Sequence, residues 1–123
     1  MKLRSQYTCP LELTHDVTKG KWKPIILWQL GKGGPRQPSE LEKSIQGINQ
    51  KMLLEQLTEL SEAGMAEKRT AEGYPLKTQY TLTKRGKRML EAITIMQEIG
   101  AEMMAESGMD EARQMLGGSE GTN

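Results

Sequence analysis

The spacing of hydrophobic residues predicts a helix in the apolar segment WKPIILWQL, residues 22–30. Ile26, Leu27 and Leu30 fall on one face of such a helix and form an apolar stripe. Pro24 fits because the first turn of a helix does not need its missing N–H group. A glycine-rich segment follows and ends the helix. This part of the chain is therefore expected to be a helix with one buried side.

A shorter helix is expected just before it, directly after Pro10. Leu11, Leu13 and Val17 are available for a core, and Gly20 lies in the break that ends the helix. The residues before Cys9 carry no periodic pattern. The sequence therefore predicts that the helical part of the chain begins near this cysteine.

Two further helices are expected to meet across a tight turn. The first starts at Ser39, because Ser39 and Glu42 have the spacing of a capping box, in which each side chain accepts from a backbone N–H group at the helix start. It ends near Ile45, since the QGI segment around Gly47 breaks the helical pattern. The second is expected to run over residues 50–63.

Asn49 is a good N-cap for the second of these helices, predicted from Gln50 to about Ala63. Gly64 follows in the position of a residue that ends a helix. The apolar residues of the helix share one stripe: Leu53, Leu57 and Leu60. Its polar side chains lie largely away from that stripe, so one face is expected to be buried and the other exposed.

The period changes after Gly64. The segments MAEKRT and KTQYTL have strand-like patterns, with Tyr80 and Leu82 alternating with polar neighbours, and the turn EGYP separates them. A β-hairpin with a basic, exposed tip is therefore expected. Thr83 resembles the N-cap of a last long helix, which Gly108 ends or interrupts.

Apolar residues in this last helix recur at alternating steps of four and three, namely Met89, Ile93, Met96, Gly100 and Met103. Such a heptad-like seam is typical of a helix that packs against a partner helix. The expected organisation is a flexible segment over residues 1–8, one domain over residues 9–107 and a polar, flexible tail over residues 108–123. A chain of 123 residues is expected to form one domain with a single hydrophobic core.

The predicted order is helix, helix, helix-turn-helix, two-stranded hairpin and long helix. The chain is therefore expected to be mainly α with a small β-hairpin, an α+β fold of the winged helix-turn-helix type, whose usual target is DNA. Seven basic residues against one acid between Lys68 and Arg88, followed by an acidic C-terminal region, favour a polyanion partner on one surface. Ordinary solvated faces are the alternative explanation.

The composition narrows the remaining chemistry. One cysteine and one histidine cannot build an intrachain disulfide or a metal centre, so no metal and no cofactor are expected. Cys9, His15 and Asp16 are the only nucleophile, base and acid combination, and no protease signature surrounds them, so the chain is not expected to be an enzyme. It lacks a membrane-spanning apolar stretch and a secretion signal, and is expected to be soluble and cytoplasmic.

Base contacts are expected from the start of the recognition helix, at Asn49, Gln50 and Lys51. The amide of Gln50 can pair with adenine, and Lys51 can reach guanine or a phosphate. Leu54, if exposed, can touch a thymine methyl group. Alternatively, Leu54 is a boundary residue of the core and Asn49 only caps the helix.

The hairpin is expected to act as the wing and to hold basic and aromatic side chains over the DNA backbone: Lys68, Arg69, Tyr74 and Lys77. Ser39, at the start of its helix, can hold another phosphate together with neighbouring backbone N–H groups. Trp22 and Trp28 are most simply core anchors, and lining an effector pocket is the alternative for either.

The segments CPLELTHDVTKGKWKPIILWQL, GPRQPSELEKSIQGINQKMLLEQLTELSEAGMAEKR and YPLKTQYTLTKRGKRML together resemble the HxlR-type winged-helix transcriptional regulators, relatives of the MarR group. The resemblance covers Cys9 to about Met96. It implies a homodimer that is built from the first and last helices and places two recognition helices on an inverted repeat. The residues expected at that interface are Leu11, Met89, Ile93, Met96 and Met103. One departure, Gln37-Pro38 in place of the frequent Arg-Phe, removes an expected backbone contact.

The resemblance also singles out Cys9, which falls on a cysteine that senses oxidants or electrophiles in some members of the family. With no second cysteine, the products available to it are an intersubunit disulfide, a mixed disulfide or an adduct. A buried structural thiol is the alternative. For the whole protein, the alternative to a DNA-binding regulator is a winged helix that binds another protein. A small-molecule or oxidant effector is possible with either function.

Overall fold

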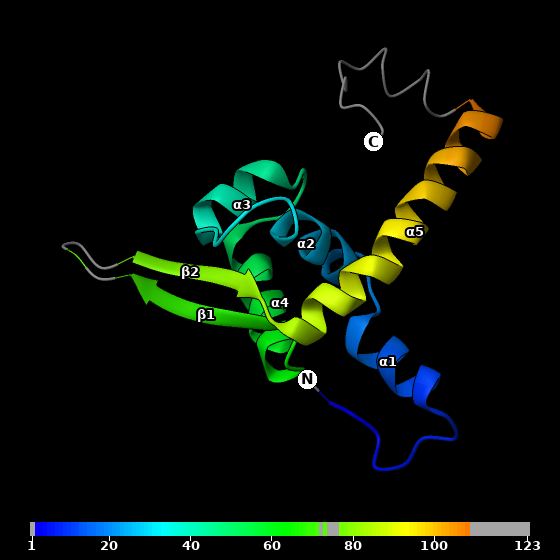
Figure 1. Cartoon of the computed structure of the whole chain (residues 1–123), viewed down its shortest axis with the longest axis horizontal. Coiled ribbons are helices and arrows are strands. Elements are labelled where there is room, and N and C mark those ends of the chain that lie inside the picture. The colour runs from blue at the N-terminus through cyan, green and yellow to red at the C-terminus, as the bar shows by residue number, and fades with distance from the viewer. Residues whose placement is uncertain (1, 72, 74–76, 109–123) are drawn as a thin grey trace. The chain divides into compact units, whose positions relative to one another are not determined.

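The computed structural model describes residues 2–71, 73 and 77–108. Its elements follow the predicted order (Figure 1), and their bounds are α1 (Pro10–Thr18), α2 (Trp22–Leu30), α3 (Pro38–Ser44), α4 (Gln50–Glu62), β1 (Ala66–Ala71), β2 (Lys77–Leu82) and α5 (Lys84–Ser107). The predicted winged helix-turn-helix architecture is confirmed. By its internal contacts the chain divides into two units, Met1–Leu90 and Glu91–Asn123. The described part of the second unit consists almost entirely of the remainder of α5.

The core of the first unit is built where three helices meet. Its largest fully buried side chains come from α2, α3 and α4, and they are Ile26, Leu27, Leu41, Leu53, Leu57 and Leu60. Removing each of these aliphatic side chains from water stabilises the fold by about 1.5–3 kcal/mol. The predicted apolar stripes of α2 and α4 are confirmed, and the opposite side of α4 is left exposed.

The start of α3 differs from the prediction. The helix begins at Pro38, and its capping acid is Glu40, whose carboxylate accepts a 2.7 Å hydrogen bond from the backbone N–H of Gln37. Ser39 is therefore the second residue of the helix, and the predicted Ser39–Glu42 capping box is wrong. The physical reason is that Pro38, with its fixed φ, is suited to the first helical position and shifts the whole cap back by two residues.

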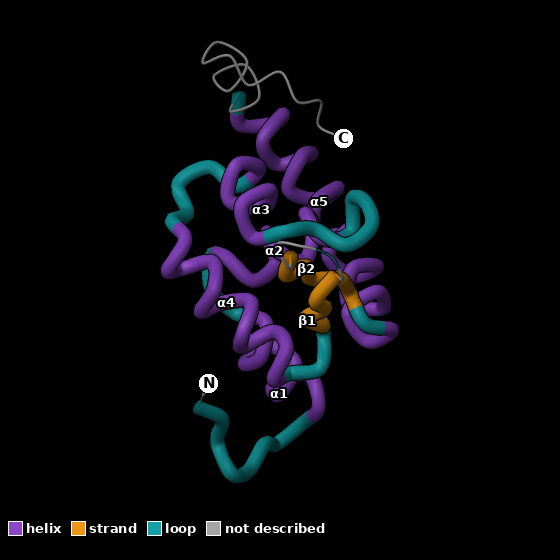
Figure 2. Tube along the Cα trace, turned by 90° about the vertical axis from the view of Figure 1, so that its left-hand side faces the viewer, coloured by secondary structure: helices purple, strands orange, loops and turns teal. Residues whose placement is uncertain are grey.

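The hairpin of β1 and β2 is antiparallel, with Ala66 opposite Leu82 and Lys68 opposite Tyr80. Figure 2 shows it beside α3 and α4, which both contact it. Arg36 adds a third segment to this sheet, because its backbone N–H donates to the Tyr80 carbonyl at 2.9 Å and its carbonyl accepts from the Tyr80 N–H at 2.8 Å. The loop before α3 is thereby joined to the wing.

The side chain of Arg36 extends this connection to two helices. Its guanidinium donates to the carbonyl of Gln29 at 3.1 Å and to the hydroxyl of Ser44 at 2.7 Å. Gln29 lies in the last turn of α2, and Ser44 is the last residue of α3. One arginine therefore fixes the loop against both helices, a role that the sequence analysis did not identify.

The junction between the hairpin and α5 is held by the predicted cap. The hydroxyl of Thr83 accepts from the backbone N–H of Gly86 at 3.0 Å and donates to the carbonyl of Gly64 at 2.6 Å. Arg85 donates to the carbonyl of Ala63 at 2.8 Å, at the end of α4. Gly64 has a φ of +76°, the left-handed conformation expected of a residue that ends a helix. The start of α5 is thus fixed to the end of α4.

The first helix departs from the prediction on its apolar residues. Of the three expected to contribute to a core, Val17 is buried, whereas Leu11 is 75% exposed and Leu13 is 39% exposed. The two tryptophans are half-buried rather than fully enclosed. Among the described residues, no helix is long and apolar enough to cross a bilayer.

Lys23 is the one charged residue in the buried set of the described chain, and it joins α2 to α4. Its ammonium donates to the side-chain oxygen of Gln56 at 2.9 Å and to the carboxylate of Glu59 at 2.6 Å. The hydrogen bond from Lys23 lowers the pKa of Glu59 below its usual value of 4.5. The carboxylate therefore stabilises the fold fully above pH 4.5. That contribution disappears as the pH falls through the lowered pKa.

Replacing Glu59 by Gln keeps an oxygen acceptor for Lys23 but removes the charge. We expect a loss of about 1–2 kcal/mol at pH 7, a value reduced for the partial exposure of Glu59. The difference between wild type and variant should close as the pH falls from 4.5 through the lowered pKa, because wild-type Glu59 then becomes protonated as well. Urea unfolding at a series of pH values measures this, and a difference that does not change with pH would contradict the assignment.

Candidate nucleic-acid interface

The first turn of α4 presents its polar residues to solvent. Asn49 is the N-cap, and its side-chain oxygen accepts from the backbone N–H of Met52 at 2.8 Å. The side chains of Gln50 and Lys51 are exposed directly after it. The predicted cap is confirmed, and the oxygen of Asn49 is already occupied by that role. Gln50 and Lys51, unlike Asn49, are therefore available to contact a binding partner.

Leu54 lies one turn further along α4, at the border between the buried and exposed faces. Its side chain is 37% exposed, whereas neighbouring Leu53 and Leu57 are completely buried. The condition that the sequence analysis set for contact with a thymine methyl group, exposure of this leucine, is met. A partly exposed apolar side chain beside Lys51 gives this surface both charged and apolar contacts.

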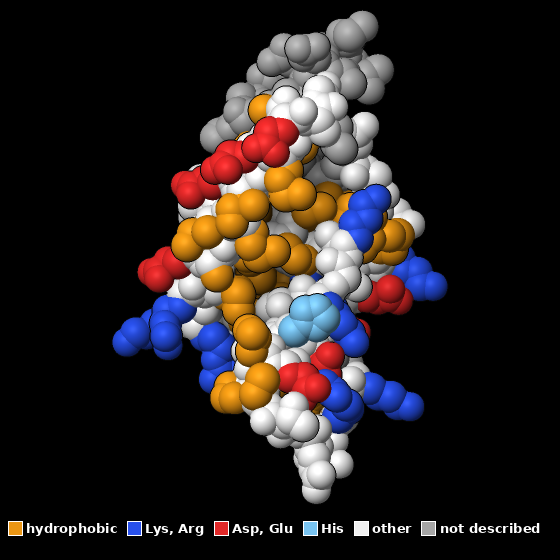
Figure 3. Space-filling view, turned by 90° about the vertical axis from the view of Figure 1, so that its right-hand side faces the viewer, with side chains coloured by type: hydrophobic (Ala, Val, Ile, Leu, Met, Phe, Trp, Pro, Cys, Tyr) orange, Lys and Arg blue, Asp and Glu red, His pale blue; other side chains and the backbone are white. Residues whose placement is uncertain are grey.

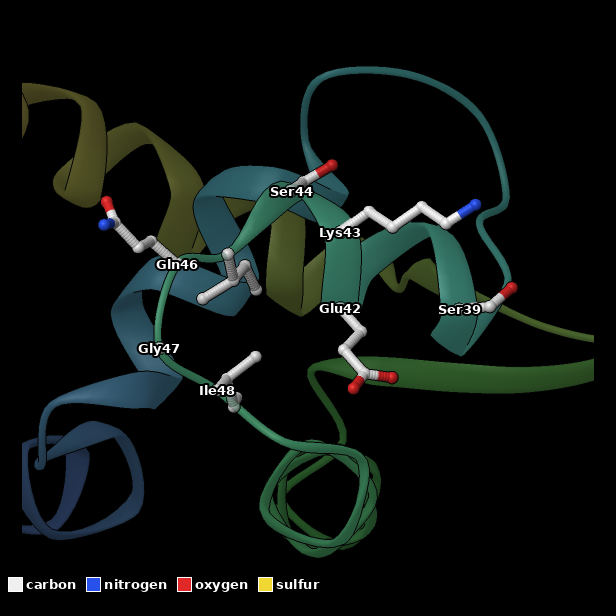
Figure 4. A pocket seen from close by; sticks show the side chains of 8 residues that line it. Ser39, Glu42, Lys43, Ser44, Gln46, Gly47 and Ile48 are labelled. Atoms are coloured by element: carbon white, nitrogen blue, oxygen red, sulfur yellow. The ribbon is translucent and has the colours of Figure 1, made fainter. Parts of the chain in front are cut away.

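A depression of about 640 Å³ lies along α3 and the turn that leads to α4 (Figure 4). Ser39 and Lys43 point to the same side of α3 in Figure 4, and Glu42 points in a different direction. Ser44 is less available, because its hydroxyl accepts from Arg36 at 2.7 Å and donates to the carbonyl of Glu40 at 3.0 Å. Lys43 was missed by the sequence analysis. Its spacing could have identified it as a candidate site residue, because Lys43 follows Ser39 by four residues and so lies on the same face of the helix.

The wing presents basic side chains on both of its faces. Lys68, Arg69 and Lys77 are exposed, as predicted. Side chains of directly opposite residues share a face, so Lys68 lies on the face of Tyr80. Arg69 and Lys77 lie on the other face, in pairs that the Thr70–Thr78 pair separates. Arg69 also pairs with Glu67 at 3.4 Å.

Tyr74, the remaining residue predicted in the wing, lies outside the described residues. Beyond the wing, the basic run at the start of α5 is divided between two roles. Arg85 is a structural residue, since it donates to the end of α4. The side chains of Lys84, Lys87 and Arg88 are exposed.

Cys9 is exposed and stands at the N-cap position of α1, in extended backbone, with its thiol making no capping hydrogen bond. The carboxylate of Glu12, in the first turn of α1, accepts a 2.8 Å hydrogen bond from the backbone N–H of Thr8, which lowers the pKa of the glutamate. Within one chain Cys9 is therefore not the buried structural thiol that was the alternative.

The segment before Cys9 is held against α1 by polar contacts. The hydroxyl of Tyr7 donates to the carboxylate of Asp16 at 2.8 Å and lowers its pKa. Arg4 stacks over the Tyr7 ring at 4.5 Å and pairs with Glu12 at 3.2 Å. Cys9 therefore stands between a helix and a segment that folds back onto it.

The predicted dimer residues differ in exposure within one chain. Leu11, Met96 and Met103 are exposed by 75%, 59% and 62%, whereas Ile93 is 6% exposed and Met89 is half-buried. Figure 3 shows hydrophobic side chains gathered on an exposed face, with acidic side chains along its edge.

On α5, two further residues widen the exposed apolar face, because Ile95 is 57% exposed and Ile99 is 49% exposed. The sequence analysis missed them because they lie one step outside the heptad-like seam. Among the described residues, no cluster of histidine, cysteine and acidic side chains has a geometry that could hold a metal ion.

Comparisons with known proteins place this geometry among regulators. A family model described as HxlR-like helix-turn-helix matches residues 17–108. MalR of Fusobacterium mortiferum, described as a regulatory protein, is 35% identical over 102 residues, which cover 83% of this chain and 96% of MalR. The redox regulator HypR in its oxidized form aligns with a TM-score of 0.72 and 33% identity, over 76% of this chain and 96% of HypR.

A protein described as a MarR-family transcriptional regulator, from Porphyromonas gingivalis W83, aligns with a TM-score of 0.72 and 29% identity. The alignment covers 82% of this chain and 98% of that protein. The match to the family model extends over α2 to α5 and includes the helix-turn-helix, the wing and the last helix.

Replacing Asn49 by Ala removes the cap of α4. The unpaired N–H of Met52 should lower the free energy of unfolding by about 1 kcal/mol, measured by thermal or urea unfolding. Asn49→Ser is the matched control, because a serine hydroxyl also caps a helix and should retain most of the stability. Equal stability of all three proteins would show that the hydrogen bond does not hold the helix start.

Proposed function

Because the chain belongs to the HxlR-like helix-turn-helix family, we propose that this transcriptional regulator binds double-stranded DNA as a homodimer at an inverted repeat. The observation that carries the proposal is the two-sided character of α4. One side is buried on Leu53, Leu57 and Leu60, and the first turn of the helix presents Gln50 and Lys51 to solvent. A recognition helix enters the major groove with its N-terminal residues toward the base edges.

Each side chain on the exposed side of α4 has its own role in this proposal. Gln50 offers donor and acceptor groups of the kind that pair with adenine, and Lys51 reaches guanine or a phosphate. Leu54 meets thymine methyl groups. Asn49 positions these residues by capping the helix, rather than by reading a base. Sequence-specific reading would therefore depend on Gln50, Lys51 and Leu54.

The wing and α3 supply contacts that position the protein on the duplex. Lys68, Arg69 and Lys77 lie on a projecting hairpin, and we assign them to the phosphate backbone. Ser39 and Lys43 extend to the same side of α3 (Figure 4) and would contact a phosphate near the recognition helix. Tyr74 is assigned to the same wing surface from the sequence. Such contacts strengthen binding on any sequence and make it sensitive to salt.

The exposed apolar face of α5 supports the homodimer. Ile95, Met96, Ile99 and Met103 are roughly half exposed or more, and contiguous apolar surface of this kind marks interaction sites. We assign this face, together with Leu11 of α1, to the contact between two copies of the chain. Met89 and Ile93 border it and are already shielded within one chain.

We further propose that Cys9 is a thiol switch. Its thiol is exposed and uninvolved in capping, and one similar structure is named as that of a redox regulator in its oxidized form. Of the three products open to one thiol per chain, we propose the intersubunit disulfide: two Cys9 thiolates of a dimer are oxidised to one disulfide, and their two electrons, with two protons from water, reduce an oxidant such as diamide to its hydrazine. The bond would cross the subunits at the start of α1.

Replacing Lys51 by Ala tests the recognition helix. If Lys51 contacts a base, the loss on the specific site should be about 1–3 kcal/mol, with little change on unrelated duplex DNA. A uniform loss on all sequences would reassign Lys51 to a phosphate. The measurement is titration against the intergenic DNA flanking its own gene and against a scrambled duplex, over a range of salt concentrations.

The same titration tests the proposal as a whole. Specific duplex binding that weakens steeply with salt is expected. No binding of the wild-type protein at any salt concentration would overturn the DNA-binding proposal and favour a winged helix that binds another protein.

Replacing Met96 by Glu places a charge on the exposed apolar face of α5. We expect weaker dimerisation, measured by analytical ultracentrifugation over a range of protein concentrations. Ala105→Glu is the matched control, because it adds the same charge about two and a half turns further along, on the opposite side of the helix. A dimer unaffected by Met96→Glu, or equally affected by both variants, would move the interface elsewhere.

Treatment with diamide tests the thiol switch. Wild-type protein should lose its specific DNA binding and form a disulfide-linked dimer on a non-reducing gel, and dithiothreitol should restore both properties. Cys9→Ser should bind DNA equally well with or without diamide. Wild-type binding that does not respond to diamide would remove the switch and leave the regulator intact.

A further inference from the structure

A polar cavity of about 370 Å³ lies within the first unit, where the end of α1 and the start of α2 meet the middle of α4. Four of its lining residues are lysines, and two are acids. The lysines are Lys2, Lys19, Lys21 and Lys23, and the acids are Asp16 and Glu59. A cavity of this volume is in the range of small-molecule sites, and its lining carries an excess of positive charge.

Lys23 is the buried lysine of this cavity. An ammonium group has three N–H donors. Gln56 and Glu59 accept two of them, at 2.9 and 2.6 Å. Among the described residues no third acceptor contacts this ammonium, which is 9% exposed and lines the cavity. A buried charged donor of this kind favours an additional acceptor oxygen.

The other three lysines of the cavity differ in whether they form ion pairs. Lys19 pairs with Asp16 at 3.3 Å. Lys21 stands with its ammonium 4.6 Å from the centre of the Trp22 ring, an interaction that leaves its three N–H donors available. Lys2 contributes a further ammonium from the segment that folds back onto α1. Lys2 and Lys21 can therefore turn toward a ligand without breaking an ion pair among the described residues.

We propose that this cavity binds a small molecule bearing an oxyanion, a carboxylate or a phosphate group. Its oxygens would accept from Lys23 at the base and from Lys2 and Lys21 at the rim, with the Trp22 ring as a flat wall. Lysine ammonium groups bind such anions as point charges. The site is distinct from the DNA-facing residues, since it involves the middle of α4 rather than its first turn.

We also expect ligand binding in the cavity to affect α4, the proposed recognition helix. This coupling rests on the proposed DNA-binding function. Gln56 and Glu59 are residues of α4 and are bound by Lys23 of α2. A ligand oxygen that takes up an N–H of Lys23 changes this connection between the two helices. If the ligand binds one position of α4 more tightly than another, it shifts the affinity for DNA by at most the difference between its two binding free energies.

The site can be tested on the full-length wild-type protein without DNA. The probes are sodium phosphate and sodium benzoate, titrated at constant ionic strength with chloride as the balancing anion. The readout is the nuclear magnetic resonance signal of the Trp22 indole N–H, and the Trp28 indole is an internal control. Saturable shifts of Trp22 alone are expected. A response to phosphate only, or to benzoate only, identifies which oxyanion the site takes.

A matched pair of variants tests the lysines. The double variant K2M/K21M should weaken probe binding at least tenfold. K32M is the control, because Lys32 also lies over a tryptophan ring, that of Trp28 at 5.9 Å, but does not line the cavity. Shifts that do not saturate, or an equal loss in K32M, would overturn the site.

The coupling to DNA is tested separately, by titrating operator DNA with the protein saturated by the effective probe. We expect the DNA affinity to change at least fivefold in wild type and to stay constant in K2M/K21M. A saturated site with unchanged DNA affinity would overturn the coupling. Because the first titration contains no DNA, its result is independent of whether the DNA-binding proposal holds.

Discussion

The burial of one face of α4 is the constraint on which the rest of the structure depends. Leu53, Leu57 and Leu60 are completely removed from solvent and pack in the core that α2 and α3 also supply. Because an α-helix repeats every 3.6 residues, fixing these three side chains also fixes which residues face outward. Lys51 faces away from the buried stripe and Leu54 lies at its border for that reason, whereas Gln50 is exposed because it stands at the start of the helix. The surface proposed to read DNA therefore follows from the way the helix is buried.

The features that the sequence predicted are those encoded locally. The leucine period of α4, the Asn49 cap and the Thr83 cap each depend on residues within one or two helical turns, and the structure confirms all three. The start of α3 was misplaced because two acids, Glu40 and Glu42, offered competing capping patterns. Only the position of Pro38 decides between them.

The features that the sequence did not predict depend on distant contacts. The backbone pairing of Arg36 with Tyr80 joins residues 44 positions apart, and no pattern around Arg36 signals it. The burial of Lys23 requires acceptors 33 and 36 residues later in the chain. The exposure of Leu11 has a related origin, because an apolar pattern does not reveal whether its own chain or a second copy covers it. Site residues on regular elements were therefore easier to predict than those defined by tertiary contacts.

Lys23 connects the stability of the fold to its proposed regulation. A buried ammonium is costly unless acceptors surround it, and a hydrophobic residue in its place would avoid that cost. The acceptors here belong to α4, so the position of the recognition helix is sensitive to whatever else binds this ammonium. A purely apolar contact between α2 and α4 would not respond to a charged ligand. The polar contact makes the helix pair responsive to anions, at the site where the first unit has a cavity to admit them.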